Sequence, residues 1–277
     1  MRYQEYAPSL HLRPTIDKFW TLETDASDSY PMELLLTPNG AEGFIIHPKK
    51  PDYKVIINNQ LFDVSETNVI MPYTPWKVLV AGPTQAIGLF FKAGSLHTLL
   101  KSSMASIVNQ VIELEAFLGS RVVRVLRQQV AEATPEKGII LMEQFFSNYF
   151  CNNPYVVNTV GCGVQLIRQN NGKLSIEQIA ARLGISRQAI ARQFAEKVGI
   201  SPKYYSRIIH FNAVYQFLKK NPHTSWIELT YWFDYFDQSH LIKDFYDFTG
   251  ASPKGYAALV SLVSNNEILP EMNLKLL

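Results

Sequence analysis

A row of short hydrogen-bonding side chains near the end of the 277-residue chain is the first candidate for contact with a partner. In the stretch 235–256, YFDQSHLIKDFYDFTGASPKGY, the polar side is formed by Gln238, Ser239, His240 and Lys243. The opposite, expected apolar side is formed by Phe236, Leu241, Phe245 and Phe248. A helix with this pattern packs its apolar side on a core and presents amide, hydroxyl and cationic groups outward. The stretch breaks at Gly250, so the helix is expected to be short.

The same stretch has a twin at 184–205, GISRQAIARQFAEKVGISPKYY, 51 residues earlier. Phe194 falls on Phe245, and a Ser-Pro-Lys exit follows in both copies. Upstream of each copy a Ser-x-x-Gln/Glu pattern, at 175–178 and at 225–228, predicts a capped helix start. Matched starts, turns and exits predict a duplicated unit of two helices joined by a short turn, which is a helix-turn-helix.

Positive charge is concentrated around the first copy. Residues 171–222 hold nine Lys and Arg against two acids, whereas residues 223–262 hold two Lys against five acids. A local excess of seven positive charges is typical of a surface that binds a polyanion such as nucleic acid. A solvated basic face would account for the charge alone equally well.

Residues 1–150 are expected to form an antiparallel β-sandwich or small barrel followed by helices. Short apolar runs recur about every ten residues between Pro, Gly and Asn, which is the pattern of such folds. The expected strands lie at 32–37, 43–47, 53–57, 60–64, 68–72, 77–81 and 86–91, with Asn58-Asn59 in a tight hairpin turn. Apolar spacings of three and four then predict helices at 95–104, 105–119, 120–133 and 135–150.

The C-terminal half is expected to be all helical. The segment 151–156, CNNPYV, is rich in turn residues and predicts a linker. A long helix is expected from Pro202 to about Lys219, between the two helix-turn-helix units, and a last helix from Pro253 to Val263. At ~1.5 Å per residue the long helix would span about 27 Å, which suits two recognition helices about 34 Å apart, one turn of DNA.

Enzyme chemistry finds little support in the sequence. The segment 161–166, GCGVQL, ends in Leu instead of Gly and follows no strand, so it fails as a dinucleotide-binding motif. His11, His47 and His97 are scattered without the close spacing of a metal site. Cys151 and Cys162 have neither a Pro-Cys motif nor a neighbouring His, and are expected to be two buried thiols. No enzyme activity, cofactor or metal is therefore expected.

The segment from about 155 to 262 resembles the DNA-binding domain of AraC-type transcriptional regulators. The resemblance rests on IAARLGISRQAIARQF (179–194), on SPKYYSRIIHFNAVYQFL (201–218) and on the DQSH-to-Tyr256 stretch. Three positions depart from the family: His210 replaces an Arg, Thr230 a small Ala and Asp234 the turn Gly. FWTLE (19–23) and IGLFFKAGSLHTLL (87–100) resemble, more loosely, the cupin-like sensory domains fused to such regulators.

The resemblance implies two recognition helices, at 186–197 and 237–248, that enter the major groove of DNA. Gln can read adenine and Arg can read guanine through paired hydrogen bonds. The expected DNA-contacting residues are Ser186, Arg187, Gln188, Arg192, Lys203, Arg207, Gln238, Ser239, His240 and Lys243. Acids of the second unit, Asp244 and Asp247, are expected to flank the groove-facing side or the phosphate backbone.

The expected fold class is thus α+β with two domains: a cupin-like β domain with trailing helices at 1–150, and a double helix-turn-helix domain at 155–262. Residues 263–277 form a C-terminal tail. The expected function is sequence-specific, cytoplasmic transcription regulation with double-stranded DNA as partner and without a membrane segment. A small-molecule effector in the N-terminal domain, RNA polymerase and a second copy in a homodimer stay open as partners. The alternative is a small-molecule-binding or protein-interaction protein whose DNA-binding module is weak or vestigial.

Overall fold

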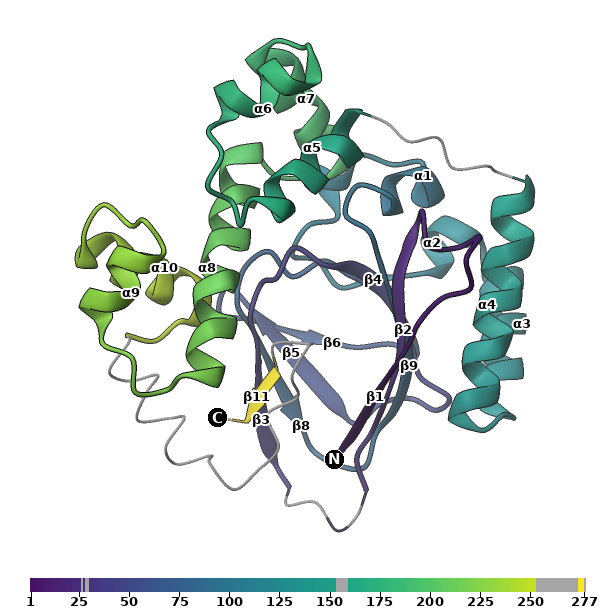
Figure 1. Cartoon of the computed structure of the whole chain (residues 1–277). Helices are drawn as coiled ribbons and strands as arrows, with labels where there is room; N and C mark the ends of the chain where they lie inside the picture. Colours follow the sequence, from purple (N-terminus) through teal and green to yellow (C-terminus); the bar gives the residue numbers. More distant parts are fainter. Residues whose placement is uncertain (26, 28–29, 153–158, 253–273, 277) are drawn as a thin grey trace.

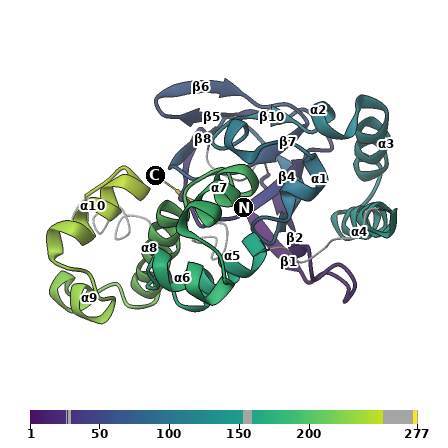
Figure 2. The same ribbon diagram turned by 90° about the horizontal axis from the view of Figure 1, so that it is seen from above.

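The N-terminal apolar runs pair into two antiparallel sheets in the computed structural model, which describes residues 1–25, 27, 30–152, 159–252 and 274–276. The six-stranded sheet has the order β1-β2-β9-β4-β7-β10, and the five-stranded sheet has the order β11-β3-β8-β5-β6. The bounds are β1 Arg2–Tyr6, β2 Ile16–Glu23, β3 Met32–Leu36, β4 Glu42–Ile46, β5 Tyr53–Ile57, β6 Gln60–Asp63, β7 Thr67–Ile70, β8 Trp76–Val80, β9 Gln85–Phe91, β10 Ile112–Glu113 and β11 Leu274–Leu276. Figures 1 and 2 show the sheets beside the helical half.

Large side chains fill the space between the two sheets. Trp20, Trp76 and Phe90 are at most 5% exposed and belong to one apolar cluster with side chains of both sheets. At Gly88 the backbone passes so close to the Trp20 ring that an added Cβ would lie 2.2 Å from it. Trp20, Trp76 and Phe90 are therefore part of the core of the β domain.

The outer face of the six-stranded sheet is covered by two helices. β9 is buried on both sides, because Phe90 points into the sandwich while Phe91 belongs to the cluster on the other side. α4 (Pro135–Asn152) packs on β2 and β9, and α3 (Ser120–Ala131) packs on α4. Phe146 of α4 stacks on Phe44 at a centroid distance of 5.9 Å. α4 therefore packs on the barrel itself.

The expected strands are all present, and Asn58 and Asn59 both adopt positive φ in the β5–β6 turn, as predicted. The strands β1, β2, β10 and β11 were not predicted. The helix predicted at 105–119 is wrong: this segment holds the 3-10 turn η1 (Met104–Ser106), β10 and the short α2 (Glu115–Leu118). The helix predicted at 95–104 is shortened to α1 (Leu96–Leu100).

Asn109 explains the broken segment. Its φ is +55°, and its side-chain oxygen accepts hydrogen bonds from the backbone N–H groups of Tyr73 (2.8 Å) and Thr74 (3.0 Å). A left-handed residue held in this way cannot continue an α-helix. Ile107 precedes Asn109 and Leu114 follows it, and both are buried in the core. The helix-like spacing of these apolar residues therefore arises from the packing of an irregular segment.

Between residues 159 and 252 the C-terminal half forms helices joined by turns, and only β11 beyond them is a strand among the described residues. Its helices are α5 Thr159–Gln169, α6 Ile176–Leu183, α7 Arg187–Lys197, α8 Pro202–Lys220, α9 Trp226–Trp232 and α10 Gln238–Thr249. The linker predicted at 151–156 begins inside α4, and its remainder lies outside the described residues, as does the helix predicted from Pro253. The antiparallel β domain and the helical domain together confirm the predicted α+β class.

The two halves touch through specific contacts. Arg168 of α5 donates hydrogen bonds to the backbone oxygens of Asn39 (3.3 Å) and Gly40 (3.0 Å), and the hydroxyl of Tyr204 on α8 donates to the backbone oxygen of Tyr73 (3.1 Å). η1 packs against α7. One buried apolar cluster runs from the outer face of the six-stranded sheet into both helix-turn-helix units.

Within the described part of the chain, no helix has both the length and the apolar character required to cross a membrane.

Candidate nucleic-acid interface

The first helix-turn-helix unit is built by α6 and α7, and its ends are capped as predicted. The Ser175 side chain accepts from the backbone N–H of Gln178, whose side chain accepts in turn from the backbone of Ser175. Gly184 closes α6 with φ +66°, a conformation that glycine adopts without the steric cost of a side chain. Ser186 then caps α7 by accepting from the N–H of Ala189 at 3.1 Å. The turn between the helices is thereby defined by two local features, the left-handed Gly184 and the Ser186 cap.

One side of α7 is buried and the other is open. Ile190 and Phe194 are at most 1% exposed and hold the helix to the domain. The predicted contact residues Arg187, Gln188 and Arg192 are all exposed, as is Ser186 at the helix start. Outward amide and guanidinium groups on a recognition helix are the groups that read base edges and bind phosphate.

Two cations of the expected interface differ in their surroundings. The guanidinium of Arg187 lies 2.7 Å from the carboxylate of Glu177 on α6, so it already has a partner. Hydrogen bonding to Arg187 lowers the pKa of Glu177, which keeps this acid charged. Lys203, in the first turn of α8, is exposed. A phosphate would therefore compete with Glu177 for Arg187.

The second unit is built by α9 and α10 in the same way. Ser225 and Glu228 form the predicted reciprocal cap, and Asp237 caps α10 by accepting from the N–H of His240 at 2.8 Å. Asp234 takes the left-handed turn position with φ +55°, where the first unit has glycine. Asp is among the few non-glycine residues that adopt this conformation readily. The turn geometry of the unit is thus retained despite the departure from the family.

The predicted contact residues Gln238, Ser239, His240 and Lys243 are all exposed at the start of α10. Leu241, Phe245 and Phe248 are fully buried, as expected for the apolar stripe. Phe236 is the exception: it was expected in that stripe, but it is 92% exposed. It lies in the turn before the helix cap, so it does not follow the helical repeat of the stripe.

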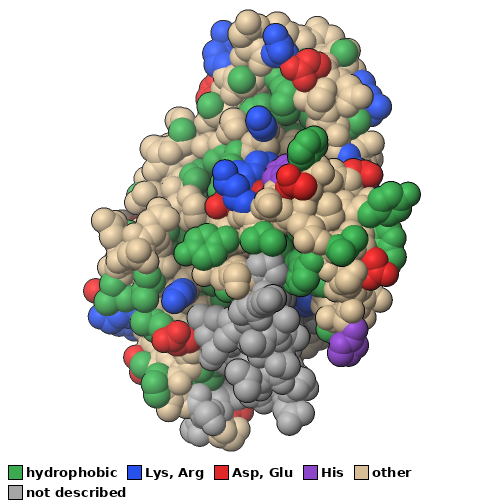
Figure 3. Space-filling view, turned by 90° about the vertical axis from the view of Figure 1, so that its left-hand side faces the viewer, with side chains coloured by type: hydrophobic (Ala, Val, Ile, Leu, Met, Phe, Trp, Pro, Cys, Tyr) green, Lys and Arg blue, Asp and Glu red, His purple; other side chains and the backbone are tan. Residues whose placement is uncertain are grey.

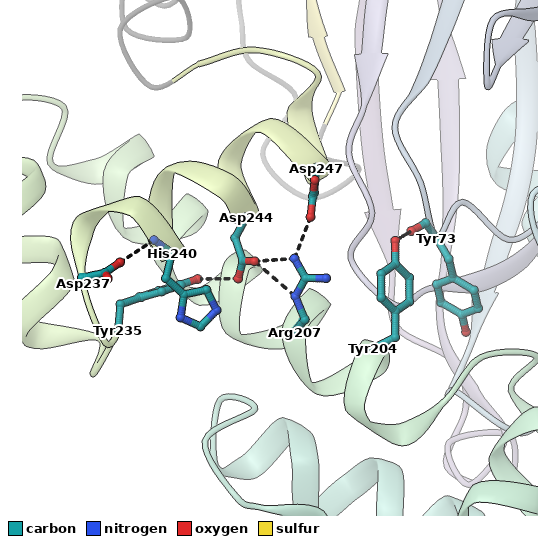
Figure 4. A network of polar contacts seen from close by, with 8 residues as sticks. All are labelled: Tyr73, Tyr204, Arg207, Tyr235, Asp237, His240, Asp244 and Asp247. Atoms are coloured by element: carbon teal, nitrogen blue, oxygen red, sulfur yellow. Dashed lines mark hydrogen bonds and ion pairs between the residues drawn. The ribbon is translucent and has the colours of Figure 1, made fainter.

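Arg207 has a different setting from the other predicted contacts, and Figure 4 shows its network. Its guanidinium donates to the Asp244 carboxylate at 2.5 and 3.2 Å, and to Asp247 at 2.8 Å. The Tyr235 hydroxyl donates to the second oxygen of Asp244, which is 1% exposed. The expectation that Asp244 flanks the groove-facing side is wrong, because this carboxylate is buried between α8 and α10.

The two units are also tied to each other. The ammonium of Lys173, just before α6, lies 2.6 Å from Asp234 in the turn of the second unit. His210 of α8 contacts the backbone oxygen of Phe233 at 2.6 Å and stacks on Tyr235 with ring centroids 4.5 Å apart. Burial lowers the pKa of His210, so the neutral ring is favoured. His210, which replaces the family's Arg, therefore serves as a packing residue between α8 and the second turn.

The apolar character of the second unit's surface was not predicted from the sequence. Ile227, Tyr231, Phe236, Ile242 and Tyr246 are between 41% and 92% exposed. Figure 3 shows hydrophobic side chains across the middle of one face, while Lys and Arg gather at its upper end, where α6 and α7 lie. Comparison of the two copies residue by residue carries the signal, because the first copy has small or polar residues at most of these places.

The His and Cys residues considered for enzyme or metal chemistry do not form a common site. Both ring nitrogens of His47 have partners, the Gln85 backbone oxygen at 2.8 Å and the Tyr53 hydroxyl at 2.9 Å. Cys151 is exposed and Cys162 is half-buried, so the expectation of two buried thiols is wrong. Across the described ranges, no three His, Cys, Asp or Glu side chains are grouped closely enough to hold a metal ion.

Family models match both halves of the chain. Residues 179–258 match the family model of a helix-turn-helix domain, and residues 4–113 match a domain of unknown function (DUF6597). No curated protein matches the chain.

Among solved structures, apo ToxT from Vibrio cholerae is 11% identical, with a TM-score of 0.47, over 87% of this chain and 97% of that one. ToxT with a bound unsaturated fatty acid is also 11% identical, with a TM-score of 0.47, over 86% and 94%. The AraC-like transcriptional activator CuxR is 14% identical, with a TM-score of 0.26, over 76% and 94%.

The family match begins inside α6 and extends past α10. The structure shows two capped helix-turn-helix units with outward recognition helices, joined by one long helix. The chain therefore carries a C-terminal helix-turn-helix domain, in which the structure shows two such units, as the resemblance to AraC-type regulators predicts.

Proposed function

We propose that the chain is a sequence-specific regulator of transcription that reads two successive major grooves of one DNA duplex. The observation that carries this proposal is the placement of two recognition helices, α7 and α10, on either side of the single helix α8. α8 has 19 residues, so it is about 28 Å long at ~1.5 Å per residue. This length suits two recognition helices about 34 Å apart, one turn of DNA.

The site residues follow from this geometry. In the first unit Gln188 and Arg192 would contact bases, while Ser186, Arg187 and Lys203 would contact phosphates. In the second unit Gln238, Ser239, His240 and Lys243 would form the DNA-facing surface of α10. Arg207, by contrast, would act by holding α10 in position, since its guanidinium is occupied by Asp244 and Asp247.

The test uses the full chain. Duplexes are selected from a random pool, and binding to the best one is measured at several salt concentrations. The logarithm of the affinity should fall linearly with the logarithm of the salt concentration, by about 0.9 per phosphate contacted. Arg192→Ala should weaken binding, and Arg124→Ala, an exposed arginine on α3, should not. A folded protein that binds no duplex in a salt-sensitive way at low ionic strength would refute the proposal.

We place the functional boundaries at 1–150 for a sensory or dimerisation domain, at 155–262 for the DNA-binding domain and at 263–277 for a tail. RNA polymerase and a second copy of the chain are further partners that a regulator of this class could engage. DNA as partner implies that the protein works in the cytoplasm.

No enzymatic step or metal is part of the proposal. Elemental analysis of protein purified without chelators should accordingly find no stoichiometric transition metal.

The cavity between the two halves supports control by a small molecule. It has a volume of about 760 Å³, within the range of ligand pockets, and is lined from the β domain and from α5 and α8. Among the described residues that line it are three cations, Lys18, Lys92 and Arg168, and one acid, Asp17. This balance favours an anionic organic molecule, whose binding would bridge the β domain and the DNA-binding domain.

A thermal-shift screen of small organic acids tests the effector proposal. A true effector should raise the melting temperature of the wild type and should do so less for Lys92→Met. The exposed Lys49, outside the cavity, provides the matched control Lys49→Met. An equal response of all three proteins would remove the cavity as the effector site.

A further inference from the structure

The second recognition helix exposes apolar side chains where a DNA-reading helix usually carries polar ones. On α10, Ile242 is 41% exposed and Tyr246 is 62% exposed. Ile242 lies one helical turn after Gln238 and next to Lys243, both also exposed. Residues four apart on a helix lie side by side, so Gln238 and Ile242 form one continuous strip of the outward surface.

Comparison of α10 with its counterpart α7 shows which side chains the fold of the unit requires. With Phe194 aligned to Phe245, both fully buried, Ile242 corresponds to Ala191 and Tyr246 to Ala195. The same fold is thus built in α7 with two small side chains at these positions. The fold of the unit therefore does not require apolar side chains of this size at these two places, and their exposed parts are available for a contact outside the protein.

Charge on the same helix points to DNA as the occupant. Asp244 and Asp247 are drawn to Arg207 by ion pairs of 2.5 and 2.8 Å, which offsets two carboxylates that would otherwise repel phosphate. The helix lies wholly inside the region that matches the helix-turn-helix family, so the strip is continuous with the proposed reading surface.

We infer that Ile242 reads the C5-methyl group of a thymine, so that the second half-site is recognised by apolar contact together with the amide of Gln238. The thymine methyl is the apolar feature of the base edges in the major groove, and apolar side chains discriminate thymine through it. The neighbouring Gln238 suits adenine. The second half-site, the part of the operator that α10 contacts, is therefore A·T-rich at the base pairs that face Gln238 and Ile242. The inference rests on the proposed function.

The test removes the methyl group and leaves the hydrogen bonds unchanged. In the operator selected by the full-length protein, each thymine of the second half-site is replaced in turn by deoxyuridine. One replacement should weaken wild-type binding about fourfold, because burying one methyl-sized group contributes ~0.8 kcal/mol. Ile242→Ala should bind the unmodified operator less tightly by a similar factor and should be indifferent to that replacement.

Ile227→Ala provides the matched control, since Ile227 is 70% exposed in the same unit but lies on α9. This variant should keep the full sensitivity to the missing methyl. A wild type that is indifferent to every replacement, or an Ile242→Ala variant that stays as sensitive as the wild type, would overturn the inference.

A footprint on the same operator separates this inference from the proposed function. Protection of two half-sites one turn apart, together with methyl sensitivity in one of them, supports both. Protection of a single half-site, or of two without methyl sensitivity, overturns the thymine contact and leaves DNA binding standing. Failure to select any duplex would end the proposed function itself.

Discussion

Arg207 fastens the second recognition helix to α8. It contributes charged hydrogen bonds to a carboxylate, Asp244, that is 1% exposed and also accepts from Tyr235. A buried carboxylate loses its hydration, and it stays charged at low cost only when a cation and hydrogen-bond donors replace the water. The residue therefore stabilises the orientation of α10, and through it the reading surface.

Arg207→Ala should lower the free energy of unfolding by about 3–5 kcal/mol, because it leaves Asp244 buried without its cation. The double variant Arg207→Ala, Asp244→Asn should recover part of this loss, since the amide carries no charge. Urea unfolding measures both. If Arg207 contacted phosphate instead, the alanine variant would stay stable and its salt slope in DNA binding would fall by about one.

Glu42 makes the stability of the β domain dependent on pH. Its carboxylate is fully buried and accepts from the N–H of Gly94 at 2.9 Å and from the Tyr73 hydroxyl at 3.2 Å. Burial raises the pKa of Glu42 from 4.5 to about 7. Between these values the folded protein holds a proton that the unfolded chain has released, so stability falls as the pH rises through this window.

The replacement Glu42→Gln should remove that dependence, which amounts to roughly 3 kcal/mol between pH 4 and pH 8. His47, whose pKa burial lowers to about 4, contributes the opposite slope, because its stabilisation is lost as the pH falls from 6.5 through 4. The hydrogen-bond partners of His47, Gln85 and Tyr53, differ from those of Glu42, so the His47 contribution cancels in the difference between the two proteins. Denaturant unfolding at several pH values measures the difference, with the exposed Glu33→Gln as control. Parallel pH profiles of wild type and Glu42→Gln would contradict this account.

At the scale of elements, the sequence predicts best where a local rule decides the structure. Both capping boxes, the Asn58-Asn59 turn and the seven alternating strands follow from neighbouring residues. The segment 105–119 could not be predicted in this way, because Asn109 breaks the helix through bonds to residues 73 and 74.

The recognition surfaces likewise combine features that the local sequence predicts with features that depend on distant contacts. The helices α7 and α10 and their outward polar residues follow from the repeat of 51 residues. The role of Arg207 does not, because its partner Asp244 lies 37 residues further along and meets it only after α8 and α10 have packed.

The two recognition helices should contribute unequally to binding. The first unit lies in a segment with nine cations and two acids, and the second in a segment with two cations and five acids. Arg192→Ala should therefore cost roughly 1–3 kcal/mol of binding free energy and relax specificity at one base position. Lys243→Ala should cost less. Binding curves for both variants on one selected operator at fixed salt compare them directly, and a larger loss for Lys243→Ala would reverse the assignment.

At the scale of the whole molecule, the interface between the halves couples the β domain to the first helix-turn-helix unit. The backbone turn at Gly40, with φ +72°, lies close enough to the Tyr205 ring that an added Cβ would come within 2.9 Å of it. Tyr205 is fully buried, and its hydroxyl accepts from the Nε of Arg168 at 2.8 Å. Arg168 thus joins α5, α8 and the Asn39–Gly40 turn in one network, beside the cavity proposed for an effector.

This network predicts that the two halves unfold together. Calorimetry of the wild type should show one transition whose calorimetric and van't Hoff enthalpies agree. Arg168→Met keeps the apolar stem but removes three donated hydrogen bonds, so it should lower the melting temperature by roughly 4–10 °C and separate the transitions of the two domains. Arg124→Met, on the exposed side of α3, should leave the single transition unchanged. Two transitions in the wild type, or equal shifts in both variants, would mean that the domains are joined only through the chain, and an effector in the cavity would then lack a route from the β domain to the DNA-reading helices.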